Sequence, residues 1–402
     1  MPTIRWHATL AAVLCTAIAM AASAQQPPPE EPFWAKGRPK GDDAARMAPV
    51  PAFPIPTAAD QLPTARFKLP PGFKVETWAP GVLDARELRQ GSKGTVFVST
   101  LFVGNKVYAI TDKGGKREAR TLIDKMELAT GIEFYKGALY VATPRQVVRY
   151  DDIENKLDNP GTPVTVYDKL PGDVPHGWKY LRIHDDKLYL AIGAPCNICD
   201  PGEDHAKIIR MNLDGTGVET VARGVRNSVG FDFDPKTGDL WFTDNGRDWL
   251  SEDLPNDKLN HVTQLNQHFG YPYCHQGNIA DPEFGWGKSC NDFQKPVALL
   301  GPHAAGLGMT FYRGTMFPKK YQGAIFIARH GPWNRTVKYA DIAIAWPDGK
   351  GGVSKVEPFM TGFVENNSYL GRPVDFLVLK DGSMLVSDDH AGAIYRISYH
   401  GR

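Results

Sequence analysis

Histidine, arginine, asparagine and tryptophan residues recur in this chain just before or just after short apolar segments. They are His176, Arg226, Asn227, Trp333, Arg335 and Arg372. Guanidinium groups bind carboxylates through paired hydrogen bonds and stack on planar groups, so the set is typical of a pocket for a planar anion, with the Trp333 indole on a ring face. His176 is the natural general base there, because an imidazole accepts a proton near neutral pH. Each residue alone is more often a packed structural residue or part of a solvated loop, and only their recurrence indicates a common site.

One kind of apolar segment occurs six times and would position these residues. Each copy begins with a small, polar or charged residue, continues with three or four apolar residues rich in β-branched and aromatic types, and generally ends with a small or charged residue. The copies span 95–100, 138–143, 187–192, 239–244, 324–329 and 383–388. Repeats of this kind are typical of propeller blades, in which each four-stranded sheet buries its faces only against its neighbours. The sequence therefore predicts an all-β fold, a six-bladed β-propeller.

The two ends of the propeller region both read as strands. Residues 73–79 and 393–398 alternate between apolar and polar types, and sharing one blade between them would close the ring and remove its free edges. The interval between the fourth and fifth copies is far longer than the others, which indicates an insertion there. Because the loops of one propeller face converge on the axis, we expect the polar residues to meet at that face.

The composition argues for a small-molecule partner. The chain has 402 residues, with 46 Lys and Arg against 45 Asp and Glu. A net charge near zero offers no electrostatic footprint for nucleic acid or for an anionic membrane surface.

The N-terminus has the pattern of an export signal. Residues 1–24 combine Arg5, an apolar run over 8–22 and the small residues before position 25, which predicts a cleavable signal peptide and a periplasmic or secreted protein. No later stretch is long and apolar enough to span a bilayer. Residues 25–65 are rich in Pro and Ala and predict a mobile linker, which leaves 66–402 for the propeller.

Four cysteines remain after the signal: Cys196, Cys199, Cys274 and Cys290. An even number in an exported protein predicts two disulfides, and we favour the near-neighbour pairs Cys196–Cys199 and Cys274–Cys290 among the three connectivities. A zinc site made of all four cysteines is the alternative. The first pair has the spacing of a haem attachment site, but Asp200 stands where the axial histidine would be.

Several motifs together resemble the soluble pyrroloquinoline-quinone (PQQ) dependent sugar dehydrogenases, and among them the sorbosone-dehydrogenase-like branch. The resemblance covers about residues 66–400. Its motifs are HGWKYLR at 176–182, GAPCNIC at 193–199, RGVRN at 223–227, WFTDNGRD at 241–248, HFGYP at 268–272, HGPWNR at 330–335 and GRP at 371–373.

The resemblance implies a PQQ- and calcium-dependent oxidation of an aldose or related sugar, with electrons passed to an external acceptor such as a cytochrome. His176 matches the base that takes the proton of the anomeric hydroxyl while hydride passes to the quinone. Arg226 and Asn227 match the pair that holds the quinone oxygens and stabilises the reduced cofactor.

Other positions match the metal site and the cofactor carboxylates. Gly246 and Arg247 match the residues whose backbone carbonyls bind a calcium ion, which acts on the cofactor as a Lewis acid. Arg372 matches an arginine that binds a cofactor carboxylate. The cofactor ligand of the fifth blade is left open among Arg329, His330 and Arg335.

The chain also departs from the glucose-oxidising members of that family. Pro175 stands where an aspartate precedes their histidine, and the nearest acid is Asp173; Leu370 stands near the first arginine of their sixth-blade pair. Thr130 is nearest to their sugar-binding glutamine. These departures put glucose specificity in doubt, and the insertion that holds Cys274 and Cys290 is expected to border the site and influence substrate preference.

Two other functions fit the same fold. A calcium-dependent lactone or ester hydrolase would need several carboxylates at axial positions, where this chain has mostly Arg, His and Asn. A non-catalytic propeller that binds a peptide or glycan is the second alternative, because the fold alone does not decide function.

Overall fold

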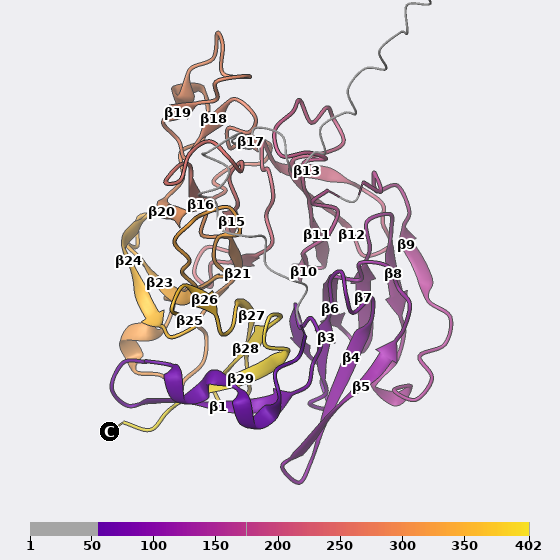
Figure 1. The fold of residues 1–402 in the computed structure, drawn as a ribbon. Helices are drawn as coiled ribbons and strands as arrows, with labels where there is room; N and C mark the ends of the chain where they lie inside the picture. The colour runs from indigo at the N-terminus through magenta and orange to yellow at the C-terminus, as the bar shows by residue number, and fades with distance from the viewer. Residues whose placement is uncertain (1–54, 174, 402) are drawn as a thin grey trace, which may run out of the picture. The chain divides into compact units, whose positions relative to one another are not determined.

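The structure is a computed structural model that describes residues 55–173 and 175–401. These residues form six sheets of four or five antiparallel strands each, apart from one short parallel addition, arranged around a common axis (Figure 1). The predicted six-bladed β-propeller is confirmed. The predicted signal peptide and most of the predicted linker lie outside the described residues.

The first three blades follow one another along the chain. Blade 1 contains β2 (Leu88–Gln90), β3 (Val96–Ser99), β4 (Val107–Lys113) and β5 (Lys116–Ile123). Blade 2 contains β6 (Gly131–Tyr135), β7 (Ala138–Ala142), β8 (Val147–Tyr150) and β9 (Val164–Tyr167). Blade 3 contains β10 (Leu181–His184), β11 (Lys187–Ile192), β12 (Lys207–Asn212), β13 (Glu219–Arg223) and the short β17 (Gln267–His268).

The other three blades complete the ring. Blade 4 contains β14 (Phe231–Phe233), β15 (Leu240–Asp244), β16 (Asn256–His261) and β20 (Ala298–Pro302). Blade 5 contains β21 (Gly306–Phe311), β22 (Ile325–Arg329), β23 (Asp341–Pro347) and β24 (Val353–Met360). Blade 6 contains β27 (Pro373–Val378), β28 (Met384–Asp388), β29 (Ala393–Tyr399) and β1 (Phe73–Pro80).

Short elements connect the blades. Two hairpins stand apart from them, β18 (Cys274–His275) with β19 (Ile279–Ala280) and β25 (Val364–Glu365) with β26 (Ser368–Tyr369). The 3-10 helices are η1 (Ala59–Gln61), η2 (Pro63–Arg66), η3 (Ile153–Asn155), η4 (Cys290–Asp292) and η5 (Lys319–Tyr321).

The six repeated apolar segments are the second strands of the six blades. They contain β3, β7, β11, β15, β22 and β28. Nearly every residue of these strands is buried, because both faces of each sheet pack against a neighbouring blade. The repeat is therefore the sequence pattern of a strand that is covered on both faces, and it sets the spacing of the blades.

The N-terminal and C-terminal strands close the ring as predicted. Strand β1 pairs antiparallel with β29, with Phe73 opposite Tyr399, and lies beside the last strands in Figure 1. The chain just before β1 also packs on this blade, since Leu62 is buried in its core and the N–H of Thr57 donates to the carbonyl of Ala391. Leu62 and Pro63 are buried, whereas Ile55 and most other residues of 55–65 are exposed, so only part of this stretch packs on the propeller.

The long fourth interval is an insertion between β16 and β20. Within it, β17 pairs in parallel with β13 of the preceding blade, and the β18–β19 hairpin projects beyond the sheets (Figure 1). Disulfides join Cys274 to Cys290 inside the insertion and Cys196 to Cys199 in the loop after β11. Both predicted pairings are confirmed.

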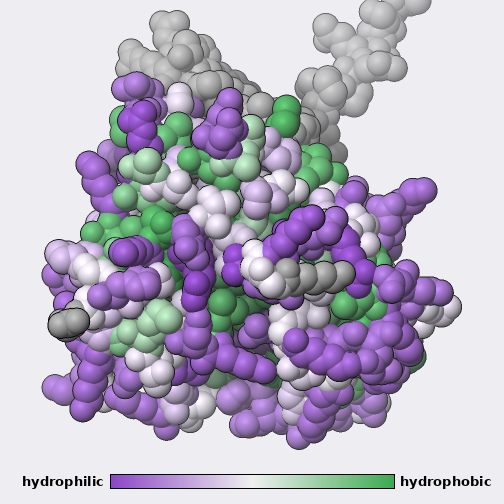
Figure 2. Space-filling view, turned by 90° about the horizontal axis from the view of Figure 1, so that it is seen from below, coloured by the Kyte–Doolittle hydropathy of each residue, from purple (hydrophilic) through white to green (hydrophobic). Residues whose placement is uncertain are grey.

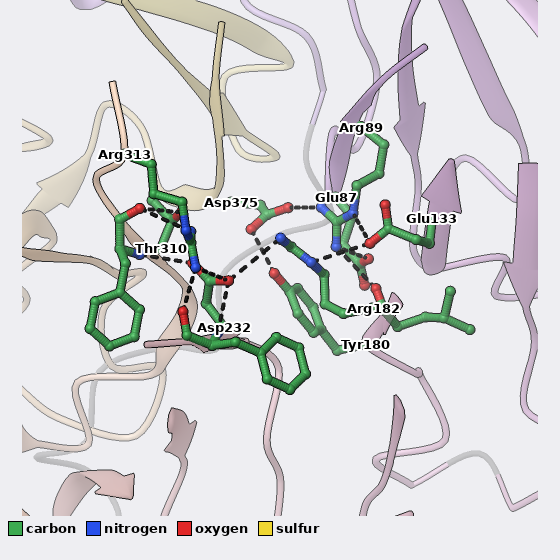
Figure 3. A network of polar contacts seen from close by, with 12 residues as sticks. Glu87, Arg89, Glu133, Tyr180, Arg182, Asp232, Thr310, Arg313 and Asp375 are labelled. Carbon is green, nitrogen blue, oxygen red and sulfur yellow. Dashed lines mark hydrogen bonds and ion pairs between the residues drawn. The ribbon is translucent and has the colours of Figure 1, made fainter. Parts of the chain in front are cut away.

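A network of buried ion pairs and hydrogen bonds crosses the centre of the propeller (Figure 3). Each innermost strand contributes one member: Arg89 of β2, Glu133 of β6, Arg182 of β10, Asp232 of β14, Thr310 of β21 and Asp375 of β27. Arg89 lies 2.9 Å from Asp375 and 3.3 Å from Glu133, which also pairs with Arg182 at 3.2 Å. The network connects all six blades across the axis.

The outer surface is largely polar on the face shown in Figure 2, where hydrophobic residues show only in separate areas between hydrophilic ones. Within the described part of the chain, no helix is both long and apolar enough to cross a bilayer.

Candidate active site

His176 lies in the loop that leads into β10, in a conformation that few residues adopt. Its φ is +47°, in the left-handed region, and its side chain is buried. Gly193, at the end of β11, makes room for it, because a Cβ there would lie 2.5 Å from Cβ of His176. Backbone conformations of this kind occur at functional sites, where the surrounding structure holds them in place.

The surroundings of His176 leave it in the form of a base. Nδ1 lies 2.8 Å from the carbonyl oxygen of Ala194, which only accepts hydrogen bonds, so Nδ1 carries the proton and Nε2 keeps its lone pair. Burial, together with the positive charge of Arg226, lowers the pKa of His176 to about 3. The imidazole is therefore neutral at physiological pH, with Nε2 able to accept a proton.

This protonation state gives a direct prediction. We expect the ring of His176 to stay neutral between about pH 5 and pH 8 in the cofactor-free protein, whereas an exposed histidine titrates near pH 6.5. NMR of the histidine rings over this range should show constant chemical shifts for His176. A titration of its signals near pH 6.5 would contradict the buried, neutral environment.

Asn227 is connected to His176 through an aromatic side chain. The rings of His176 and Trp178 meet edge to face with their centroids 5.4 Å apart, and Nε1 of Trp178 donates to Oδ1 of Asn227 at 3.1 Å. The backbone N–H of Asn227 donates in turn to Asp244 at the end of β15. Trp178 thereby sets the position of both predicted site residues.

Arg226 lies deep in the same cluster with its guanidinium almost fully engaged. Nε and Nη2 donate to the backbone and side-chain oxygens of Asn197, Nη2 also donates to Asp248, and Nη1 donates to the carbonyl of Asn245. These contacts with the described residues use four of the five N–H bonds of the group. One N–H, at Nη1, is left for a ligand.

Gly246 and Arg247 follow β15 beside this cluster. The N–H of Gly246 donates to buried Asp257 at 2.7 Å. The guanidinium of Arg247 pairs with Asp281 at 2.7 Å and with Glu283 at 3.0 Å, both in the insertion. These ion pairs anchor the side chain of Arg247 in the insertion.

The donor atoms around Gly246 suit a calcium ion. Oδ1 of Asn245 and Oδ1 of Asn334 are buried and accept no hydrogen bond from any residue that the structure describes. Calcium prefers several uncharged or carboxylate oxygens, including backbone carbonyls. Over residues 55–173 and 175–401 there is no group of three or more His, Cys, Asp or Glu placed to hold a metal.

Trp333 and Arg335 follow β22 but point to different places. Nε1 of Trp333 donates to Asp248 at 3.1 Å, which brings this ring to the cluster around Arg226. Arg335 instead pairs with Asp253 and donates to the carbonyl of Glu252, on the loop after β15. Of these two predicted cofactor contacts, the structure places Trp333, and not Arg335, in contact with the other site residues.

Arg372 belongs to a second cluster, in which blades 5, 6 and 1 meet. Its guanidinium donates to the carbonyls of His330 and Gly331. Nε2 of His330 lies 2.8 Å from Asp389, which also pairs with Arg86 at 2.8 Å. Burial and the charge of Arg372 lower the pKa of His330 to about 4.

Asp257 connects the two clusters. One of its carboxylate oxygens accepts from the N–H of Gly246 and the other from the N–H of Ala305, each at 2.7 Å. The carbonyl of Ala305 accepts in turn from the N–H of His330. Burial, with a further contribution from Asp244, raises the pKa of Asp257 to about 7.

The structure also places the residues at which the chain departs from glucose-oxidising enzymes. Asp173 pairs with His205 at 2.8 Å. The hydroxyl of Thr130 exchanges hydrogen bonds with the backbone of Lys179. Arg329, one of the three candidates for the fifth-blade ligand, forms a two-pronged ion pair with Asp341 within its own blade.

Sequence reasoning assigned no role to Asn197, Asp248 or Asp257. Asn197 lies inside the CNIC motif and Asp248 ends the WFTDNGRD motif, so both stood next to residues already singled out. Asp257 carries no such signal, because it is one polar residue in an ordinary strand and acts through backbone contacts.

Comparisons with known proteins agree with this architecture. A family model described as TrAA12-like matches residues 67–283. An uncharacterized protein of Borreliella burgdorferi is 31% identical over 362 residues, which cover 86% of this chain and 94% of that protein. The chain belongs to the TrAA12-like family, and the resemblance to soluble PQQ-dependent sugar dehydrogenases is confirmed at the level of the family.

Two solved structures show the same fold at low sequence identity. The calcium structure of Trichoderma reesei Carbohydrate-Active Enzymes Family AA12 has a TM-score of 0.73 and 19% identity, over 86% of this chain and 100% of that chain. The holo form of the pyranose dehydrogenase PQQ domain from Coprinopsis cinerea has a TM-score of 0.68 and 18% identity, over 83% of this chain and 97% of that chain.

Proposed function

We propose that the protein is a PQQ- and calcium-dependent dehydrogenase of an aldose or related sugar, which passes electrons to an external acceptor such as a cytochrome. The observation that carries this proposal is the buried, neutral imidazole of His176 with Nε2 left to accept a proton. The family and the folds of a PQQ domain and of a calcium-containing relative support the choice of cofactors.

The residues of the chain have distinct roles in this proposal. Bound PQQ would supply the hydride acceptor, and bound calcium would polarise it. His176 accepts the proton of the sugar hydroxyl at Nε2 while Nδ1 stays bonded to Ala194. Arg226 offers its remaining N–H to an anionic oxygen, and Asn227 lies beside it, so negative charge that develops there is stabilised.

The metal and the cofactor carboxylates would be held by the neighbouring loops. We assign the carbonyls of Gly246 and Arg247 to calcium, Trp333 to the ring system of the cofactor, and Arg372 to a carboxylate. For the fifth-blade contact we choose His330, because Arg372 donates to its carbonyl within the second cluster, whereas Arg329 and Arg335 pair with Asp341 and Asp253 away from that cluster.

We also propose that the signal peptide directs the protein to the periplasm or out of the cell, and that 66–402 is the catalytic domain. Two disulfides support an oxidising compartment. The hydrolase alternative would need free carboxylates at the axis, whereas Glu133, Asp232 and Asp375 are paired with arginines there.

The proposal is tested by the stability of the purified protein. Ligands that bind only the native state stabilise it by about 2.7 kcal/mol at a concentration of 100 times Kd. We therefore expect calorimetry to show a higher melting temperature when PQQ and calcium are both present, together with a quinone absorption band on the protein. Calcium alone and PQQ with a chelator are the controls, and no shift with both ligands at saturation would refute the cofactor assignment.

Activity is tested separately with the loaded protein. Aldoses should reduce an artificial electron-accepting dye, and lactones and esters should not be hydrolysed. Hydrolysis in the absence of PQQ would favour the alternative hydrolase.

A further inference from the structure

We infer that Asn197 and Asp248 are positioning residues for Arg226, and that the Cys196–Cys199 disulfide holds Asn197 in place for this purpose. The inference deepens the proposed function, on which it rests: it identifies the part of the protein that holds the cofactor-binding guanidinium in one orientation.

Asn197 binds Arg226 with two different oxygens. Its backbone oxygen accepts from Nε at 2.8 Å and its side-chain Oδ1 accepts from Nη2 at 2.9 Å. Asn197 is 1% exposed and Arg226 is 3% exposed, so these bonds lie out of water, where charge-assisted hydrogen bonds are strong. Two bonds from one residue to two nitrogens fix the plane of the guanidinium.

Asp248 completes the same arrangement from blade 4. Its Oδ2 lies 3.1 Å from Nη2 of Arg226 and supplies the opposite charge. Asn197 and Asp248 also bind each other, since the N–H of Asp248 donates to Oδ1 of Asn197 at 2.7 Å and the Asn197 amide donates to the carbonyl of Asp248 at 3.2 Å. The three residues form one rigid unit that joins the loops of blades 3 and 4.

The unit extends to blade 5 through the other oxygen of Asp248. Oδ1 accepts from Nε1 of Trp333 at 3.1 Å and from the side-chain amide of Asn334 at 2.9 Å. Asp248 therefore sets the positions of both Arg226 and Trp333, which the proposed function places at the cofactor.

The disulfide explains why the short loop holds its shape. Cys196 and Cys199 flank Asn197 and are joined to each other. The hydroxyl of Tyr271, from the insertion, accepts from the N–H of Cys199 at 3.1 Å and lies 3.3 Å from Sγ of Cys196. Closing a loop of this length removes most of its alternative conformations, so the two oxygens of Asn197 stay directed at Arg226.

The experiment is a double-mutant cycle read out by PQQ affinity, measured by isothermal titration calorimetry at saturating calcium. Loss of a residue that orients a metal ligand typically costs about 10–100-fold in metal affinity, and we take the same factor for a residue that orients the cofactor-binding guanidinium. We expect Asn197→Ala to raise the Kd for PQQ by that factor, because it removes the Oδ1 contact. In the Arg226→Ala background the same change should have little further effect, since its action passes through Arg226.

A second variant tests the role of Asp248, and a control variant tests whether replacing an asparagine outside the site affects PQQ binding. Asp248→Asn retains the size of the side chain and removes its charge, so it should also raise the Kd if the protein folds normally. Asn212→Ala is the matched control, since the side chain of Asn212 donates to Thr216 in the hairpin that joins β12 to β13. The melting temperature of each cofactor-free variant separates loss of folding from loss of affinity.

The arms of the experiment distinguish the inference from the function. If the unmodified protein binds PQQ but Asn197→Ala and Asp248→Asn bind it equally well, the positioning role is refuted while the proposed function stands. Additive losses in Asn197→Ala and Arg226→Ala would also refute it, because they would mean independent contacts. If the unmodified protein does not bind PQQ, the proposed function and the positioning role are both refuted.

The role of the disulfide is tested by replacing Cys196 and Cys199 with serine. This change should raise the Kd for PQQ as Asn197→Ala does, and an unchanged Kd would remove the disulfide from the inference.

Discussion

Replacing His176 by glutamine should lower turnover by about 10²–10⁴-fold and leave PQQ bound, because a positioned general base contributes a factor of this size. Glutamine keeps a donor that can reach the carbonyl of Ala194, but it has no nitrogen lone pair to accept the sugar proton. Affinity for the cofactor should change little, since it depends mainly on calcium and on arginines that this substitution leaves in place.

The measurement combines kcat, PQQ stoichiometry and melting temperature of the His176→Gln protein. Arg226→Ala is the comparison, because it removes a contact to the cofactor itself and should weaken PQQ binding together with the rate. If the His176 variant is folded, loaded with PQQ and turns over as fast as the unmodified protein, His176 is not the base. A loss of activity that only follows the loss of folded protein would show a purely structural role.

The second large effect that we expect is a loss of folding stability when the network of ion pairs at the propeller axis is broken. Removing one partner of a buried ion pair costs about 3–5 kcal/mol, because the other charge is left buried and uncompensated. Asp375 is 1% exposed and accepts from Arg89, from the N–H of Leu88 and from the hydroxyl of Tyr180. We expect Asp375→Ala to lower the free energy of unfolding by that amount, measured by denaturant titration.

The matched control is the same substitution at an exposed ion pair. Asp158 pairs with Arg120 at 2.6 Å at the surface, where solvent screens the charges and such pairs contribute little. Asp158→Ala should therefore unfold close to the unmodified protein. Equal stability of Asp375→Ala and Asp158→Ala would mean that the axial network does not hold the blades together.

The axial network also bears on the site. Tyr180 and Arg182 belong to it (Figure 3). In the sequence they follow His176 and Trp178, on the segment that enters β10. Loosening the network at Asp375 should therefore disturb the loop that carries His176, so a loss of affinity for PQQ is expected to accompany the loss of stability in Asp375→Ala.

Much of the architecture could be predicted because its signals are local in the sequence. The six apolar segments became the second strands of the blades, since a strand buried on both faces needs a continuous apolar run wherever it lies. The pairing of β1 with β29 followed from the need to close the ring, and the cysteine pairs followed from their short separations.

The candidate site could be predicted only in part. The motifs gave His176, Arg226 and Asn227. The structure brings these three together, because Trp178 contacts both His176 and Asn227, and the backbone of Ala194 bonds to both His176 and Arg226. Arg335 stands two residues after Trp333 in the same motif, yet its guanidinium pairs with Asp253 while Trp333 contacts Asp248. Spacing along a loop does not give the direction of a side chain.

The sequence by itself determined the number and kind of the blades and the residue types capable of chemistry, and it favoured the disulfide pairs that the structure shows. Only the tertiary structure decided which of these residues meet. Asn197 and Arg226 follow strands of blade 3, Asp248 follows a strand of blade 4 and Trp333 follows a strand of blade 5, and ring closure and the folding of the loops bring them together. Contacts of this kind depend on distances between segments far apart in the chain, and no local pattern of residues encodes those distances.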